Sequence, residues 1–166
     1  MAERRADRVG VWEATRPTDV DVEALASLMI AAWGRQPTAD EVSKKAQRLR
    51  AELQEIDPAG RAVLVAGDPT APAGFCKTWR DEADPKTWWF VALVVDPNRR
   101  RQRIGMALAR KVESYARDHG GEVLRSETHA DNPVSILFHE AIGFINDGEM
   151  TAPDGDKIIA FHRRLR

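Results

Sequence analysis

The chain has 166 residues, which is enough for one domain with a substantial hydrophobic core. Its formal net charge of −1 argues against a general affinity for nucleic acid or for an anionic membrane surface. No apolar run approaches the roughly 20 residues that a membrane-spanning helix needs. Because Cys76 is the only cysteine, no intrachain disulfide can form, and we expect a cytoplasmic protein.

The first half of the chain alternates between strand and helix signals. We expect a disordered tail over residues 1–8, then a single domain over 9–166 that opens with a strand at 9–15. The turn Pro17-Thr18-Asp19 precedes a helical pattern that runs from Val22 to Gly34. A second helix begins with a capping box and is stopped by a proline, as marked by Thr38, Glu41 and Asp57-Pro58. Three strands are expected next, over 62–66, 73–79 and 87–95.

The second half predicts two more helices and three more strands. A helical stripe begins at Ile104 and is closed by Gly120-Gly121. A strand over 123–129 and a short helix that ends before Gly143 come next. The chain finishes with two strands, over 144–150 and 157–165. The predicted element order is therefore β-α-α-β-β-β-α-β-α-β-β, without an internal repeat or a linker.

Two motifs in this half indicate chemistry. The segment from Val94 to Gly105 reads as a buried strand, a proline, a basic turn and a helix start. The unpaired backbone N–H groups of such a turn and the helix dipole both favour bound phosphate. The second motif is Asn132-Pro133, followed by a short helix that ends at Ile142-Gly143-Phe144. Together they indicate a site for an acyl carrier that contains pyrophosphate. The arginines of the turn also fit a solvated basic face or a nucleic-acid patch, but their place between strand and helix favours cofactor phosphates.

The element order and the two motifs resemble the GNAT superfamily of acyl-CoA-dependent N-acetyltransferases. This resemblance implies a single α/β domain with a central, mixed, mostly antiparallel sheet of about seven strands, flanked by about four helices. The family's phosphate loop reads Arg or Gln, two residues, Gly, any residue, then Gly or Ala. It maps here onto Arg100, Arg101, Gln102, Arg103, Ile104 and Gly105, with Met106 next in the helix. Arg103 stands where the family has its first Gly, so either its side chain points away from the pyrophosphate or the loop shifts slightly.

The resemblance also implies acetyl-CoA as co-substrate and a set of residues that bind it. Leu93, Val94 and Val95 would splay from the next strand and offer backbone groups to the thioester and the pantetheine amides. Asn132 would hydrogen-bond the pantetheine arm. No metal is expected, because the four histidines lack the spacing of metal ligands.

Three residues are candidates for proton transfer. Glu127 is our candidate general base, because it lies five residues before Asn132, where similar enzymes place a carboxylate. His129 shares its strand face and would relay the proton through water. The alternative for both is a polar residue on a solvated strand. His139 occupies the family position of the Tyr that protonates the coenzyme A sulfur, and the alternative is a partly exposed histidine at a helix end.

The acceptor is predicted to be an amine, with several classes open. A weaker resemblance to aminoglycoside 6′-N-acetyltransferases favours an aminoglycoside or another small amine. The alternatives are a protein N-terminus, as in ribosomal-protein acetyltransferases, or a catalytically weak regulator that binds acyl-CoA. We expect no nucleic-acid or membrane partner, and a homodimer through the late strands is a family-level expectation.

Residues near one predicted hairpin have two readings. Trp79, Trp88 and Trp89 flank the turn at Asp84-Pro85 and either line an acceptor groove or belong to the core. The acidic turn residues Asp81, Glu82 and Asp84 either attract a cationic acceptor or are simply solvated. Cys76 lies in an apolar strand, so we expect a core residue rather than a nucleophile.

Overall fold

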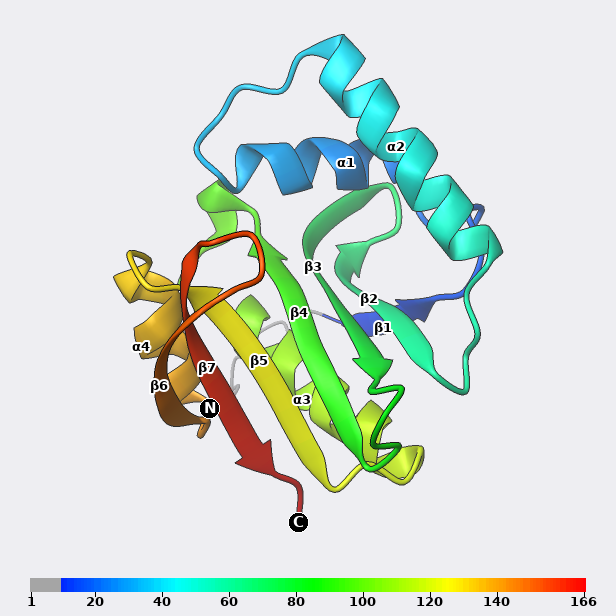
Figure 1. Ribbon diagram of the computed structural model, residues 1–166. Helices are drawn as coiled ribbons and strands as arrows, with labels where there is room; N and C mark the ends of the chain where they lie inside the picture. Colours follow the sequence, from blue (N-terminus) through cyan, green and yellow to red (C-terminus); the bar gives the residue numbers. More distant parts are fainter. Residues whose placement is uncertain (1–9) are drawn as a thin grey trace, which may run out of the picture.

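The computed structural model describes residues 10–166, so the expected tail over 1–8 and residue 9 of the first expected strand lie outside the described residues. The strands are β1 (Val11–Ala14), β2 (Arg61–Asp68), β3 (Ala71–Arg80), β4 (Thr87–Val95), β5 (Val123–His129), β6 (Ile145–Thr151) and β7 (Lys157–Arg164). The helices are α1 (Val22–Ala31), α2 (Ala39–Gln54), α3 (Ile104–Asp118) and α4 (Pro133–Ala141), with a short 3-10 helix, η1 (Pro97–Arg99). This order confirms the predicted α/β architecture (Figure 1).

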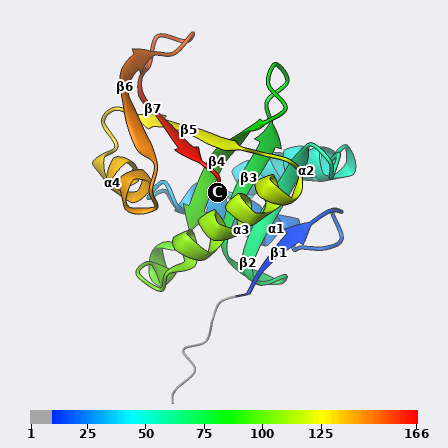
Figure 2. The same ribbon diagram turned by 90° about the horizontal axis from the view of Figure 1, so that it is seen from below.

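All the described strands form one mixed sheet in the order β1-β2-β3-β4-β5-β7-β6. Each neighbouring pair is antiparallel except β4 and β5, which run parallel. A parallel pair needs a long crossover, and α3 supplies it. The view from below shows α3 running alongside the strands that it connects (Figure 2). The mostly antiparallel sheet expected from the family resemblance is therefore confirmed.

A separate hydrophobic core covers each face of the sheet. On one face, α1 and α2 pack on alternate residues of β2 and β3, among them Val63 and Phe75. On the other face, α3 packs on residues that include Cys76, Trp88 and Phe90. Successive side chains of a strand point to opposite faces. A strand residue that packs in the first core therefore faces α1 and α2, and a strand residue that packs in the second core faces α3.

The ends of α1 differ from the sequence expectation. The helix begins after Asp21, whose carboxylate accepts a hydrogen bond from the backbone N–H of Ala24. Asp19 instead closes the preceding turn by accepting backbone N–H bonds from Thr15 and Arg16, so it does not start the helix. The helix ends at Ala31, short of the expected Gly34, while the capping box of α2 is present as predicted.

Candidate active site

The sheet opens along the boundary between its two parallel strands. Hydrogen-bonded register between β4 and β5 covers three residue pairs, and the last of these joins Trp89 to Arg125. Beyond that pair, the described register gives the two strands no further partners on their facing edges. The expected splay of the segment Leu93 to Val95 away from the next strand is therefore present, although Val94 and Val95 still pair with β3 on the other side.

A β-bulge in β4 lies beside this opening. The register with β3 passes from Phe75–Val94 to Lys77–Val91, so β4 holds one residue more than β3 over this step. Ala92 lies within the bulge with a φ of 53°, a left-handed conformation that is uncommon for a residue with a side chain. The described register includes no partner for Ala92 or Leu93. The bulge thus frees backbone groups of β4 at the point where the strand parts from β5.

The predicted phosphate loop connects η1 to α3. Arg101 and Arg103 both have positive φ, of 63° and 60°. Arg103 is the N-cap of α3 and makes no side-chain capping bond, and the first backbone bond of the helix runs from the N–H of Ala107 to the carbonyl of Arg103. The earlier N–H groups of α3 therefore have no helical partner, as an anion site at a helix start requires. The left-handed backbone of Arg103 is the conformation that a glycine adopts at low cost.

Gly105 lies where three elements meet. A Cβ built on it would stand 3.2 Å from the ring of Phe138 in α4 and 3.7 Å from the side chain of Leu93 in β4. The same helix turn packs on Gly74 of β3, where a Cβ built on the glycine would stand 2.7 Å from Ile104. The first turn of α3 is therefore seated closely on β3, β4 and α4, and two glycines permit this approach.

Asn132, the predicted pantetheine contact, is the N-cap of α4. Its side-chain oxygen accepts a hydrogen bond from the backbone N–H of Ser135 at 3.1 Å. The hydrogen bonds described for residues 10–166 leave its side-chain NH₂ without a partner. One half of the amide thus holds the helix, and the other half is free to donate.

His139 is buried, with 5% of its surface exposed, between α4 and the sheet. Its Nδ1 lies 2.7 Å from the carbonyl oxygen of Ser135, and its Nε2 lies 2.8 Å from the hydroxyl oxygen of Ser126 in β5. The same hydroxyl lies 2.8 Å from the carbonyl oxygen of Phe90, one residue past the last β4–β5 pair. The ring is stacked on Phe161, with centroids 4.6 Å apart. These contacts join α4, β5 and β4 at the vertex of the opening.

The hydrogen bonds of His139 define where its proton lies. Burial is the main cause that lowers the pKa of His139 from its ordinary value of 6.5, opposed by the bond to Ser135. A carbonyl can only accept, so the neutral ring must donate from Nδ1 to Ser135. The hydroxyl of Ser126 has a single proton, so beside the neutral ring it donates either to Nε2 or to the carbonyl oxygen of Phe90, and not to both. Only the protonated ring carries a proton on Nε2, and in that form Ser126 is free to donate to Phe90.

Glu127 and His129 lie on the opposite face of the sheet from His139. Arg125 pairs with Trp89, and Trp89 pairs with Trp79. Trp79 lies four residues after Phe75 in β3, so both side chains are on the face that carries α1 and α2. Residues 125, 127 and 129 therefore share the face that carries α1 and α2. The side chains of Arg125 and Glu127 are exposed there. Nδ1 of His129 lies 3.7 Å from a carboxylate oxygen of Asp156 in the β6–β7 turn.

The three expected groove tryptophans separate. Trp88 is fully buried in the core beneath α3, which is the core alternative of the two that the sequence left open. Trp79 and Trp89 face the other side, where they line a cavity of about 1000 Å³ beside the β3–β4 turn. Adjacent residues of one strand point to opposite faces, which is why Trp88 and Trp89 part. Cys76 is fully buried as expected, and burial raises the pKa of its thiol.

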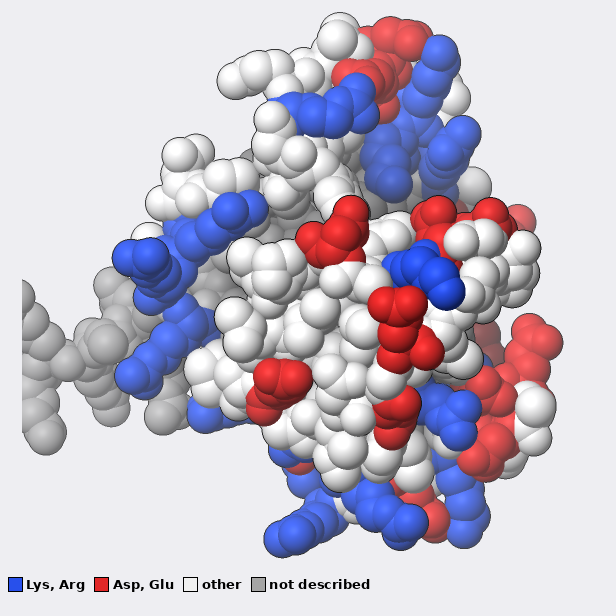
Figure 3. Space-filling model, turned by 60° about the vertical axis from the view of Figure 1, so that its left-hand side comes forward, with Lys and Arg blue, Asp and Glu red and all other residues white. Residues whose placement is uncertain are grey.

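Charged groups are distributed unevenly on the face shown in Figure 3. Lys and Arg side chains lie around the periphery of this view, at the left, the bottom and the upper right, and separate Asp and Glu groups lie across a largely uncharged centre. Within residues 10–166 no group of three or more His, Cys, Asp or Glu side chains is placed to hold a metal ion. No helix of this part of the chain is long and apolar enough to cross a membrane.

Solved structures share the fold that carries this site. A protein from Desulfovibrio desulfuricans described as an acetyltransferase of the GNAT family is 21% identical over 96% of this chain and all of its own, with a TM-score of 0.77. An aminoglycoside 6′-N-acetyltransferase in complex with coenzyme A is 17% identical over 95% of this chain and 97% of its own, with a TM-score of 0.69. The ribosomal-protein-S18-alanine N-acetyltransferase from Escherichia coli is 17% identical over 95% and 94%, also with a TM-score of 0.69.

These solved structures share the overall fold of this chain. A family model described as "Acetyltransferase (GNAT) family" matches residues 23–144, which is most of the chain. The protein belongs to this family. Comparison with curated proteins gave no match.

Several residues that shape this site are not marked by any motif in the sequence. The positive φ of Ala92 could not be predicted, because glycine rather than alanine is the residue that favours this conformation. Ser126 lies in a strand whose alternate residues are buried, and a polar residue on that face was a usable sign of a buried partner. Phe138 belongs to the apolar pattern of α4, but only the fold shows that it meets Gly105.

Proposed function

We propose that this protein transfers the acetyl group of acetyl-CoA directly to a primary amine of a small polar molecule, with an aminoglycoside as one candidate acceptor. The observation that carries the proposal is the opening between β4 and β5, beyond the pair Trp89–Arg125. On one side of it lie the uncapped start of α3 and the NH₂ of Asn132, and on the other side the exposed carboxylate of Glu127. This arrangement supports a reaction in which both substrates are bound at the same time.

The residues present fit a bound acyl carrier. The backbone N–H groups of the phosphate loop and of the first turn of α3 would hold the pyrophosphate, and Gly105 lets that turn pack closely on Phe138 and Leu93. The free inner edge of β4 and the NH₂ of Asn132 would bind the amides of the carrier arm, much as an added strand does. When bound, acetyl-CoA supplies the acetyl group as a thioester. The backbone donors would come from Leu93, Val94, Val95, Arg100, Arg101, Gln102, Arg103, Ile104, Gly105 and Met106.

Two side chains on the open face are proposed to prepare the amine. An aliphatic amine has a pKa near 10, so it must lose a proton before it can attack. Glu127 is exposed on the face that carries α1 and α2, and we assign it as the base that takes this proton. His129, two residues further on the same face, would pass the proton to solvent.

His139 is proposed to deliver a proton to the opening through Ser126. The Ser126 hydroxyl lies 2.8 Å from Nε2 of His139 and 2.8 Å from the carbonyl oxygen of Phe90, so it would take a proton from the protonated ring and give its own proton to the departing sulfur. Because this relay needs the protonated ring, the ratio of kcat of the wild type to kcat of His139→Ala should increase as the pH falls toward the lowered pKa of His139. His139→Ala should reduce kcat about tenfold or more. Ser126→Ala should cause a similar loss, and the double variant should lose no more than either single one.

The experiment that tests the function measures coenzyme A release from acetyl-CoA with a thiol-reactive dye. The acceptors are an aminoglycoside, a polyamine, free amino acids and a short peptide with a free N-terminus. Background from the protein is low, because its single thiol is fully buried. We expect strong stimulation by the aminoglycoside or the polyamine.

Other outcomes would overturn this proposal in distinct ways. Stimulation by the peptide alone would make the protein an acetyltransferase of protein N-termini. A melting temperature that rises with acetyl-CoA, without transfer to any amine, would indicate a regulator that only binds the acyl carrier.

A further inference from the structure

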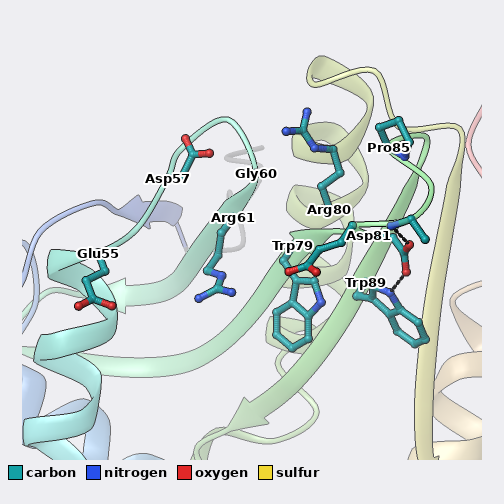
Figure 4. A pocket seen from close by; sticks show the side chains of 11 residues that line it. Glu55, Asp57, Gly60, Arg61, Trp79, Arg80, Asp81, Pro85 and Trp89 are labelled. Carbon is teal, nitrogen blue, oxygen red and sulfur yellow. Dashed lines mark hydrogen bonds between the residues drawn. The ribbon is translucent and has the colours of Figure 1, made fainter.

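We propose that the cavity beside the β3–β4 turn is a second binding site for the acceptor, which holds a positively charged group remote from the amine that reacts. The cavity measures about 1000 Å³ and lies between the end of α2, the start of β2 and the β3–β4 turn (Figure 4). The inference rests on the proposed transfer to a small amine. It adds that the acceptor carries at least two amino groups, of which one reacts and another is held in the cavity.

Two indole rings form the floor of this site. Trp79 and Trp89 are directly paired in the register of β3 and β4, so their rings project on the same side of the sheet (Figure 4). The ring of Trp89 is fixed, because its Nε1–H donates to a carboxylate oxygen of Asp81 at 2.8 Å. The ring of Trp79 already accepts a cation, since the guanidinium carbon of Arg61 lies 5.8 Å from its centroid. The described cation–π contacts leave the ring of Trp89 without such a partner.

The charges around the indoles favour a cationic ligand. Four carboxylates and two guanidiniums line the cavity, which gives it a net charge of −2 at neutral pH; the residues are Glu55, Asp57, Asp81, Glu82, Arg61 and Arg80. The carboxylate of Asp81 is committed to Trp89 and to the turn backbone, and its bond to the Trp89 indole is the first cause that lowers its pKa. Among residues 10–166, the side chains of Glu55 and Glu82 have no described ion pair. These two exposed carboxylates are therefore available to an ammonium group.

The cavity and the proposed reaction site lie on the same face of the sheet. Trp89 pairs with Arg125, and Glu127 lies two residues beyond Arg125 on that face. Along β4, Ala92 in the bulge lies three positions after Trp89, which corresponds to about 10 Å at the rise of a strand. An acceptor with a second ammonium group at about this separation would reach both places. A monoamine, or a diamine with a short chain, would not.

Diamines of increasing length test this geometry. We would compare kcat/KM for acetyl transfer to diamines from 1,3-diaminopropane to 1,10-diaminodecane with that for monoamines of the same chain length. We expect the ratio of diamine to monoamine to rise with length and to reach its highest values for chains near that of 1,8-diaminooctane. A ratio that stays flat across the series would overturn the second site while leaving acetyl transfer to amines intact.

Calorimetric titration without acetyl-CoA separates the site from the reaction. We expect 1,8-diaminooctane to bind more tightly than octylamine, and Trp89→Leu to reduce this preference about two- to fivefold, the usual size of an exposed cation–π contact. Trp33→Leu is the matched control, because Trp33 is 70% exposed at the end of α1 and lies outside the cavity. A preference that survives Trp89→Leu unchanged would overturn the proposal.

A second variant removes the charge without touching the indoles. Glu55→Gln with Glu82→Gln changes two exposed side chains and should not disturb folding, and we expect it to lower the preference for the diamine most strongly at low ionic strength. If the wild type prefers the diamine in calorimetry but transfers no acetyl group to any amine, the site stands and the proposed reaction fails. If transfer occurs but neither variant alters the preference for the diamine, the reaction stands and the site fails.

Discussion

At the residue scale, His139 links pH to stability through burial. Its pKa is lowered from 6.5 in the folded protein, chiefly because the ring is buried, so the unfolded chain binds the proton more readily. The stability that depends on the neutral ring is fully present above pH 6.5. We expect the free energy of unfolding to decrease as the pH falls from about 6.5 through the lowered pKa, and then to level off.

Denaturant unfolding between pH 7.5 and pH 5 measures this effect. His139→Phe is the matched variant, because the site is lined by Phe90, Phe144 and Phe161 and tolerates an aromatic ring. The variant should lose the part of the pH dependence that the ring causes. Equal slopes for the wild type and the variant would show that His139 is not the group that titrates.

Glu127 belongs to the residue scale as well. If its carboxylate takes the proton of the acceptor amine, Glu127→Gln should lower kcat/KM about 10²–10⁴-fold at neutral pH, the usual contribution of a general base. The loss should shrink at alkaline pH, where more of the amine is already deprotonated. Glu140→Gln is the control, since Glu140 is an exposed carboxylate on α4. Steady-state rates over a range of pH give the comparison, and a uniform loss at every pH would argue for a structural effect.

Arg103 combines an unfavourable backbone with a useful charge. A side chain in the left-handed region costs about 1–2 kcal/mol, and glycine avoids that cost but loses about 0.5–1 kcal/mol in conformational entropy. Arg103→Gly should therefore unfold at a denaturant concentration equal to or slightly above that of the wild type. Arg103→Ala keeps the strain and removes the same charge, so it should be the less stable of the two.

The same pair of variants tests the phosphate loop. Both lack the guanidinium, which does not touch the pyrophosphate when the side chain points away, so both should raise the KM for acetyl-CoA only slightly and to a similar extent through the lost long-range attraction that salt screens. A KM that rises only for Arg103→Ala would show that the backbone of the loop matters and that the charge does not.

At the element scale, the seat of α3 on the sheet depends on Gly74. A methyl group there would stand 2.7 Å from Ile104, 3.0 Å from Leu108 and 3.1 Å from the carbonyl oxygen of Val94. Overpacking of this kind costs about 1–3 kcal/mol, and it acts on the first turn of the helix that would hold the phosphates. Gly74→Ala should therefore lower the melting temperature and raise the KM for acetyl-CoA. Gly10→Ala, where nothing lies within 4 Å, should change neither.

The elements themselves could be predicted because their signals are local. The bounds of β4 and β5 agree with the expected strands 87–95 and 123–129, since each is a run of strand-forming residues between turn signals. The capping box of α2 was read from Thr38 and Glu41 for the same reason. The bulge at Ala92 escaped prediction, because it results from the register between two strands rather than from a residue preference.

The parts of the candidate site that lie in continuous motifs could be predicted, and the contacts made by packing could not. The phosphate loop and the start of α4 are marked by motifs that are continuous in sequence, so the sequence indicated where they lie. The contact of His139 with Ser126 joins residues 13 positions apart through the packing of α4, and no spacing rule predicts it. The separation of Trp88 from Trp89 did follow from strand alternation, and that rule was available before the structure.

At the scale of the whole molecule, the opened pair gives the sheet inner edges in addition to its outer ones at β1 and β6. An unpaired strand edge is normally a hazard, because it offers a template for the strand of another chain. Here the two edges converge at Trp89 and Arg125, so the space between them narrows to nothing at one end. A full protein strand would need room along its whole length, whereas a slender amide-bearing chain can occupy only the wide part. The narrowing of this space therefore disfavours the pairing of β4 with a strand of a second copy of the chain, while the wide part leaves the edge of β4 open to a small ligand.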